Sequence, residues 1–206
     1  MHAFTTERLL IRPLISEDEH FYCYQYTDKK MMRIVGEPLT QEQASAAFHR
    51  ALKANKLEQD TVRTWAIVDK ATNDIIGTQA LSWLAAKQAT KPSSLPIEQV
   101  EIGIMLATKA NGKLLPEEAV SAIMEYGFKQ LNINRINAFY ANKNRATQRI
   151  LKKIGYIFEP SLQDNTTDNG YQYFDQHQWN GMIITQLFPE EIDKTEPTVT
   201  DSRLTV

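Results

Sequence analysis

The chain of 206 residues has a single cysteine, Cys23, so it cannot form an intrachain disulfide. This composition favours a reducing compartment, and we expect a cytoplasmic location. No apolar run is long enough to span a bilayer, and the first residues lack the basic and apolar segments of a signal peptide. The four histidines have no metal-ligand spacing, so no metal site is expected.

An excess of charge of one sign is also missing. Lys and Arg number 23 and Asp and Glu 25, which gives a formal net charge of −2. This balance provides no general attraction to nucleic acid or anionic lipid, so neither is expected as a partner. The length suits one domain, which we expect over residues 1–188. The polar, non-periodic residues 189–206 are expected to form a mobile tail.

Sequence patterns predict strands that alternate with amphipathic helices. Helix starts are indicated by two capping boxes, Ser16 to Glu19 and Thr40 to Gln43, and by Asn144, which precedes a short helix ended by Gly155. A longer helix over 115–131 is expected to expose Glu117, Glu118, Glu125 and Lys129. The strands are expected over 8–14, 64–68, 75–81, 99–106, 135–140, 156–158 and 178–187, with a loop over 87–96.

The turn at residues 109–113 lies between an apolar strand and the long helix. Backbone N–H groups at a helix start have no partner within the helix and carry the positive end of its dipole. Lys109 and Lys113 add two positive charges. The turn is therefore suited to a phosphate or pyrophosphate group.

Several motifs, in their order and spacing, resemble the GNAT superfamily of acyl-CoA-dependent N-acetyltransferases, and specifically its RimJ/RimL-type ribosomal-protein N-terminal acetyltransferases. These motifs are residues 6–14, residues 101–106, the Gly112 turn with Glu118 and Ala119, residues 144–147, and residues 153–156. The resemblance implies an α/β (α+β) fold with a mixed, mostly antiparallel central sheet flanked by helices. The fourth and fifth strands of this sheet are expected to splay apart.

The same resemblance implies that acetyl-CoA is the co-substrate. Its pantetheine arm would lie between the splayed strands, against backbone groups of Ile104, Met105 and Leu106, with Asn144 within reach of the arm. Its pyrophosphate would lie against the turn formed by Lys109, Ala110, Asn111, Gly112, Lys113 and Leu114.

Two positions depart from the family pattern. Leu114 stands where the family has a small residue, and Leu151 stands where many relatives have a tyrosine. A small residue is needed where backbone and phosphate approach closely. The departures support an alternative, in which the chain is a non-catalytic GNAT-like domain with a CoA-binding or regulatory role.

Acetyl transfer to an amine needs a base for the amine and a proton for the departing thiolate. Glu101, on the strand that would present the thioester, is the candidate base and could act through water; the alternative is a solvent-facing glutamate paired with a lysine. Glu98 is a second candidate. Thr147 is the candidate donor to the thiolate, although the Asn144 to Thr147 spacing also suits a helix cap.

The acceptor is expected to be a protein N-terminus or a small-molecule amine that attacks the thioester directly. Met32, Arg33 and Trp83 lie where the family builds its acceptor pocket, and core packing explains the same residues equally well. Cys23 is expected to be packed rather than nucleophilic. We expect a monomer or a homodimer.

Overall fold

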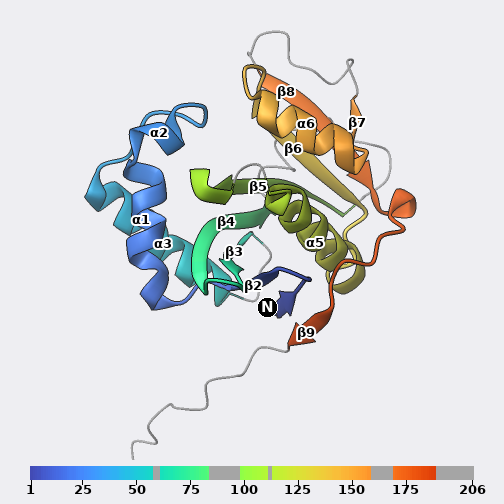
Figure 1. Ribbon diagram of the computed structural model, residues 1–206, viewed down its shortest axis with the longest axis horizontal. Helices are drawn as coiled ribbons and strands as arrows, with labels where there is room; N and C mark the ends of the chain where they lie inside the picture. Colours follow the sequence, from blue (N-terminus) through green and yellow to red (C-terminus); the bar gives the residue numbers. More distant parts are fainter. Residues whose placement is uncertain (58–60, 84–97, 111–112, 159–168, 189–206) are drawn as a thin grey trace, which may run out of the picture.

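The computed structural model describes residues 1–57, 61–83, 98–110, 113–158 and 169–188. In this part of the chain, nine strands form one sheet in the order β7-β8-β6-β5-β4-β3-β2-β1-β9 (Figure 1). The strands are β1 Ala3–Thr5, β2 Leu9–Pro13, β3 Val62–Asp69, β4 Asp74–Ser82, β5 Gln99–Leu106, β6 Arg135–Ala141, β7 Ile157–Phe158, β8 Asn169–Asp175 and β9 Gln186–Phe188. The helices are α1 Glu19–Thr27, α2 Lys29–Met32, α3 Gln41–Asn55, α5 Leu115–Gln130 and α6 Arg145–Ile154.

The mixed, mostly antiparallel sheet predicted from the sequence is confirmed, and so is its splay. The pairing between β5 and β6 is parallel, and the other neighbouring pairs are antiparallel. These two strands, the fourth and fifth of the prediction, pair only from Gln99 with Arg135 to Glu101 with Asn137. Beyond that point β5 continues to Leu106 and β6 to Ala141, and their ribbons diverge (Figure 1).

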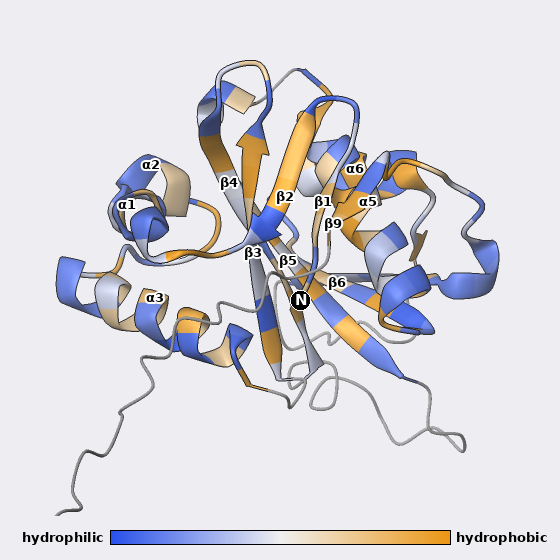
Figure 2. Ribbon diagram, turned by 90° about the horizontal axis from the view of Figure 1, so that it is seen from below, coloured by the Kyte–Doolittle hydropathy of each residue, from blue (hydrophilic) through white to orange (hydrophobic). Residues whose placement is uncertain are grey.

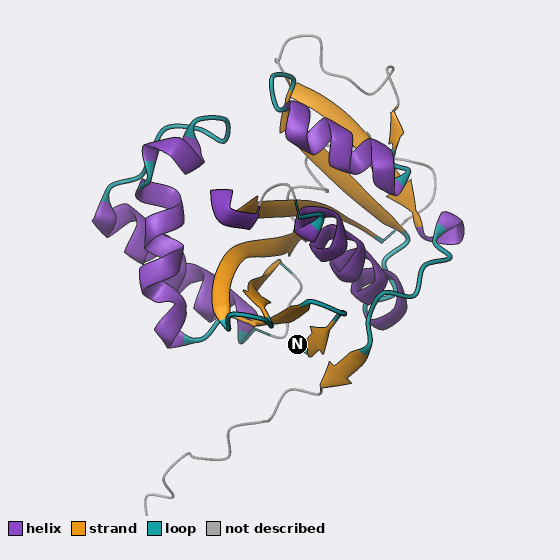
Figure 3. Ribbon diagram, in the orientation of Figure 1, coloured by secondary structure: helices purple, strands orange, loops and turns teal. Residues whose placement is uncertain are grey.

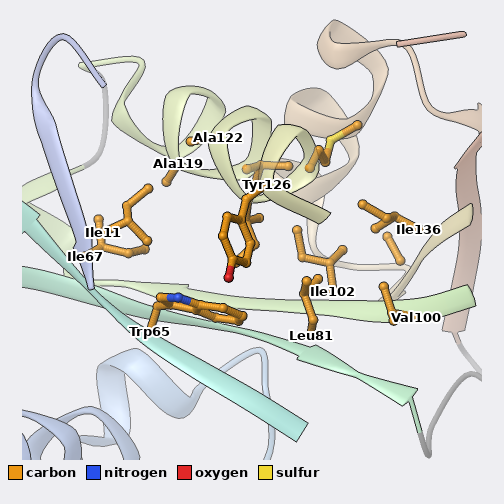
Figure 4. Close-up of a cluster of buried hydrophobic side chains, with 14 of the residues drawn as sticks. Ile11, Trp65, Ile67, Leu81, Val100, Ile102, Ala119, Ala122, Tyr126 and Ile136 are labelled. Atoms are coloured by element: carbon orange, nitrogen blue, oxygen red, sulfur yellow. The ribbon is translucent and has the colours of Figure 1, made fainter. Parts of the chain in front are cut away.

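Helices cover both faces of the sheet. α1 and α3 lie on one side, and α5 and α6 on the other (Figures 2 and 3). Under α5, Trp65 lies against the ring of Tyr126, with ring centroids 5.6 Å apart (Figure 4). Under α1 and α3, a smaller cluster contains Leu14, Tyr22, Phe48 and Ala66. Apolar side chains at helical spacing therefore bury two faces of one sheet.

The capping box at Thr40 is confirmed, because its hydroxyl accepts from the Gln43 N–H and the Gln43 side chain accepts from the Thr40 N–H. The box predicted at Ser16 is wrong. Asp18 accepts from the Ile15 N–H at 2.9 Å and receives two N–H groups of Arg12 at 2.7 and 2.8 Å. Ser16 therefore lies inside a 3₁₀ turn, and α1 begins only at Glu19.

The last predicted strand, over 178–187, is also wrong. The strand that pairs with β6 is instead β8, which comes earlier in the chain and lies between β6 and β7. Of the predicted range, the end alone is in a strand, the short β9 at the far edge of the sheet. Glu125 accepts from the N–H groups of Ile183 and Ile184 at 2.6 and 3.1 Å, which holds the intervening segment against α5. Glu125 is therefore buried rather than water-facing as predicted, and Glu118 is buried too. The predicted loop over 87–96 and the predicted tail over 189–206 lie outside the described residues.

Candidate functional site

A cavity of about 690 Å³ passes through the splay between β5 and β6. It reaches α1 and α3 on one side and α5 and α6 on the other. Its wall includes Glu101, Ile102, Gly103, Ile104 and Met105 of β5, Ala138, Phe139, Tyr140 and Ala141 of β6, Asn144, Thr147, Ile150 and Leu151 at α6, Val120 of α5, Gln79 of β4, and Tyr22, Tyr26, Ala47, Arg50 and Ala51 of α1 and α3. The loss of sheet pairing after Glu101 thus coincides with a hollow accessible from both faces.

The backbone of β5 presents polar groups to this gap. The Glu98 carbonyl accepts from Asn134 and Arg135 on the β6 side, whereas the Ala107 N–H donates to Ile76 on the β4 side. Successive residues of a strand point their backbone groups to opposite edges. The N–H and C=O groups of Ile104 and Leu106 therefore face the β6 side, where pairing with the described residues of β6 has ended.

Met105 is fixed from the opposite side. Its carbonyl oxygen accepts from Nε2 of Gln25 at 2.9 Å, and Oε1 of Gln25 accepts from the Thr78 hydroxyl at 3.0 Å. A Cβ on Gly77 would lie 2.5 Å from the same carbonyl oxygen, so this close approach of β4 and β5 requires glycine. α1 is thereby tied to the strand that borders the cavity.

Glu101 lies opposite Ser82, on the face of β5 that Met105 shares, and lines the cavity half-buried. Burial raises the pKa of its carboxyl. A carboxylate with a raised pKa is better matched to accepting a proton near neutral pH. Within the described part of the chain no lysine pairs with it, in contrast to the alternative considered from the sequence.

Asn144 and Thr147 meet the cavity from the start of α6. Oδ1 of Asn144 accepts from the backbone N–H of Thr147 at 3.2 Å, so the predicted helix cap is present. The cap uses the backbone of Thr147 and leaves its hydroxyl available. Leu151, one turn further along, is 2 % exposed and packs in the core as well as lining the cavity.

The described residues of the predicted phosphate turn, Lys109, Ala110, Lys113 and Leu114, follow β5 and are not among the residues that line the cavity. Lys109 pairs with Asp74 at 2.8 Å, and Ala110 is buried. The Lys113 carbonyl accepts from Arg8 at 2.7 Å, and Leu114 has a left-handed backbone with φ of 59° and an exposed side chain. Asn111 and Gly112 lie outside the described residues.

Glu118, in the first turn of α5, organises the start of that helix. It accepts from the Thr6 hydroxyl and from the backbone N–H and guanidinium of Arg8. Burial alone would raise the pKa of Glu118, but the hydrogen bonds from Thr6 and Arg8 outweigh it and hold the pKa below its usual range. The sequence contained a signal for this cluster, because Thr6 and Arg8 lie in the motif at residues 6–14 and Glu118 belongs to the motif that begins at the Gly112 turn.

The predicted acceptor residues are not brought into the cavity wall. Met32 is buried, Arg33 is exposed, and Trp83 is 2 % exposed in the core with Arg63 over its ring. Met32 and Trp83 are therefore placed as the alternative explanation from the sequence predicts, with their side chains packed in the core. Cys23 is also buried.

The wall on the side of α1 and α3 is formed instead by side chains that the sequence pattern did not single out. Tyr22 and Tyr26 of α1 pack with tilted rings, the centroids 4.8 Å apart, and Ile34, Val35 and Arg50 complete this part of the wall. Aromatic residues one turn apart on a helix were the available signal, but it does not distinguish a cavity wall from a core.

Among the described residues, no group of three or more His, Cys, Asp or Glu side chains could hold a metal ion. No helix among these residues has the length and apolar character needed to cross a membrane.

Residues 8–157 match the family described as the Acetyltransferase (GNAT) domain. "Uncharacterized N-acetyltransferase p20" of Bacillus licheniformis is 27% identical over 165 residues, which cover 80% of this chain and 87% of the relative. The fold is similar to that of the spermidine N-acetyltransferase from Vibrio cholerae, solved with CoA and spermine (TM-score 0.65, 18% identity, 82% of this chain and 96% of the other). It is similar also to that of the ribosomal-protein-S5-alanine acetyltransferase from Vibrio fischeri (TM-score 0.64, 20% identity, 87% and 99%).

Proposed function

The chain belongs to the GNAT acetyltransferase family, and we propose that it transfers acetyl from acetyl-CoA to an amine by direct attack on the thioester. One observation carries the proposal. The cavity through the β5–β6 splay is lined by both Glu101 and Thr147, and it is open to the two helical layers on either side of the sheet.

The pantetheine arm is proposed to enter the splay as an additional strand. The N–H and C=O groups of Ile104 and Leu106 face this gap, and an extended arm with amide groups can satisfy them. The start of α5, where backbone N–H groups have no partner within the helix, suits the pyrophosphate, with Lys109 and Lys113 before it in the chain. Lys109 would exchange its pairing with Asp74 for a phosphate oxygen.

The protons are proposed to move at two side chains. Glu101 takes a proton from the acceptor amine, directly or through water, and the amine nitrogen then forms a bond to the acetyl carbon. As the carbon–sulfur bond breaks, the sulfur leaves as a thiolate that accepts a hydrogen bond from the Thr147 hydroxyl. The attacking nitrogen gives up its second proton through water as the amide forms, and this proton converts the thiolate to the thiol of CoA. Glu101 and the acceptor would share the α1 face, whereas Thr147 reaches the gap from α6.

The acceptor is proposed to be a protein N-terminus, as in the RimJ/RimL branch, rather than a polyamine. The described part of the cavity wall contains one carboxylate, Glu101, and one cation, Arg50. A polyamine carries several positive charges and would meet too little negative charge there. A peptide N-terminus brings a single amine, and the apolar wall of Ala47, Ala51 and Val35 can take its first side chain.

The test is an assay of the purified chain with acetyl-CoA and two acceptor sets, peptides with different N-terminal residues and a series of polyamines. Release of CoA thiol and the mass of the acceptor are recorded together. We expect an added acetyl group on peptides. Transfer only to polyamines would overturn the acceptor assignment, and tight acetyl-CoA binding without transfer to any amine would favour the non-catalytic alternative.

A further inference from the structure

Gln79 is a buried polar residue without a partner in the cavity wall. Its side chain lies on β4 and is 1 % exposed. Among the described residues, neither Oε1 nor Nε2 has a hydrogen-bond partner. Buried amides are almost always satisfied, so leaving both atoms unpaired costs free energy that a bound molecule can recover.

The register of the sheet shows which side of the cavity Gln79 faces. Gln79 lies opposite Trp65 on β3 and opposite Ile104 on β5. Residues opposite each other in antiparallel strands share a face, and Trp65 lies against Tyr126 of α5 (Figure 4). The side chain of Gln79 therefore lies on the α5 face, beside Ile104.

The neighbouring residues on both strands face the other way. Thr78 bonds to Gln25 of α1, and Met105 and Glu101 share its face. The acceptor amine, which must approach Glu101, is thus on the α1 face. A ligand group that meets Gln79 is on the opposite face, at the level where the backbone of Ile104 borders the gap.

We propose that Gln79 binds the amide-containing arm of acetyl-CoA, with Nε2 donating to a carbonyl oxygen of the arm and Oε1 accepting from an amide N–H. The inference rests on the proposed function, because it takes the arm to lie in the splay. A carboxamide offers one donor side and one acceptor side without charge, which complements an uncharged chain of amides. The phosphates need cations or helix N-termini instead, and Gln79 provides neither.

The experiment compares the wild type with Gln79→Met, which keeps a similar volume and removes both polar atoms. Affinities for acetyl-CoA and for adenosine 3′,5′-bisphosphate, which has the nucleotide end but no arm, are measured by calorimetry. We expect acetyl-CoA binding to weaken by about fivefold or more, since one or two neutral hydrogen bonds are lost. Affinity for the bisphosphate should not change.

Thermal unfolding without ligand gives a second readout, with Gln172→Leu as the matched control. Gln172 is a buried glutamine that has a partner, because its Nε2 donates to the Tyr140 hydroxyl at 2.6 Å. We expect Gln172→Leu to lower Tm and Gln79→Met to leave it unchanged or raise it. Gln79→Leu replaces Gln79→Met if the latter fails to fold.

Unchanged acetyl-CoA affinity in the Gln79 variant, or equal weakening of both ligands, overturns the inference and leaves the proposed function intact. A fall in Tm as large as that of Gln172→Leu also overturns it, because it shows a structural partner. If the wild type does not bind acetyl-CoA, the proposed function fails, and the inference fails with it.

Discussion

The guanidinium of Arg8 donates to the carbonyl oxygen of Lys113 at 2.7 Å, and the same side chain pairs with the buried carboxylate of Glu118. The residue just before β2 thereby holds both the end of the turn after β5 and the first turn of α5. This contact fixes where the free N–H groups of α5 begin. If phosphates bind there as proposed, Arg8 acts on them as a positioning residue through the backbone.

Glu118 is expected to make stability depend on pH in the acid range. Its pKa in the folded chain lies below the usual value, so its stabilising contribution is complete above the unfolded pKa of about 4.3 and is lost as the pH falls through the folded pKa. Urea unfolding at a series of pH values should show a steeper acid loss for the wild type than for Glu118→Gln. Parallel curves for the two proteins would contradict the assignment.

Leu114→Gly is expected to stabilise the chain. A left-handed backbone costs a non-glycine residue on the order of 1 kcal/mol or more, and glycine removes this cost. The exposed side chain of Leu114 loses little burial when it is deleted. Leu114→Ala keeps the Cβ and serves as the control, which should gain nothing; equal stability of the two variants in denaturant unfolding would refute the explanation.

Glu101→Gln is expected to remove the acid limb of the pH–rate profile. In the wild type, kcat/KM should rise with pH as the carboxyl, whose pKa burial raises, becomes ionised. A general base contributes about 10²- to 10⁴-fold, and the loss should be largest above the pKa of Glu101, where the wild-type carboxylate is ionised and can accept the proton. A profile for Glu101→Gln that keeps the same limb would assign it to another group.

Thr147→Val is expected to slow turnover without lowering stability or acetyl-CoA affinity. The cap at α6 uses the backbone N–H of Thr147, so valine retains it and removes only the hydroxyl. Asn144→Ala is the matched comparison, because it removes the cap and should cost about 1 kcal/mol of stability. If Thr147→Val turns over at the wild-type rate, the hydroxyl has no role at the sulfur.

Gln25 and Thr78 are expected to be energetically coupled. Gln25→Leu leaves the Met105 carbonyl without its side-chain donor and should destabilise the chain by about 1–3 kcal/mol. Thr78→Val removes the hydroxyl that donates to Gln25. In a double-mutant cycle, Thr78→Val should cost clearly less in the Gln25→Leu background than in the wild type. Strict additivity would show that the two hydrogen bonds do not form one network.

Much of the fold could be predicted from the sequence because local chemistry decides it. The Thr40 box, the Asn144 cap and the left-handed Gly155 each mark a helix end with a side chain or backbone property that acts within a few residues. The errors arise where distant partners decide. Glu118 and Glu125 occupy positions that helical periodicity assigns to solvent, but Arg8 and Ile183 bury them across separations of 110 and 58 residues.

The residues of the candidate site likewise fall into those that a local sequence pattern indicates and those that depend on distant parts of the chain. The β5 and α6 residues could be predicted because a strand, a turn and a capped helix follow one another in a recognisable order. The tyrosines of α1 and the unpaired Gln79 could not. No local pattern distinguishes an aromatic residue in a cavity wall from one in a core, and the feature that singles out Gln79 is the lack of a partner in three dimensions.

The short pairing between β5 and β6 has a mechanical consequence. Within the described part of the chain, strand pairing joins the plate formed by β6, β7 and β8 to the plate formed by the remaining strands only from Gln99–Arg135 to Glu101–Asn137, whereas β6 and β8 are paired along the whole of β6. A change in tilt between the plates would therefore break few strand-to-strand hydrogen bonds and leave the pairing inside each plate intact. Beyond Glu101 the two plates are held together by the side chains packed in one core with α5 rather than by strand pairing.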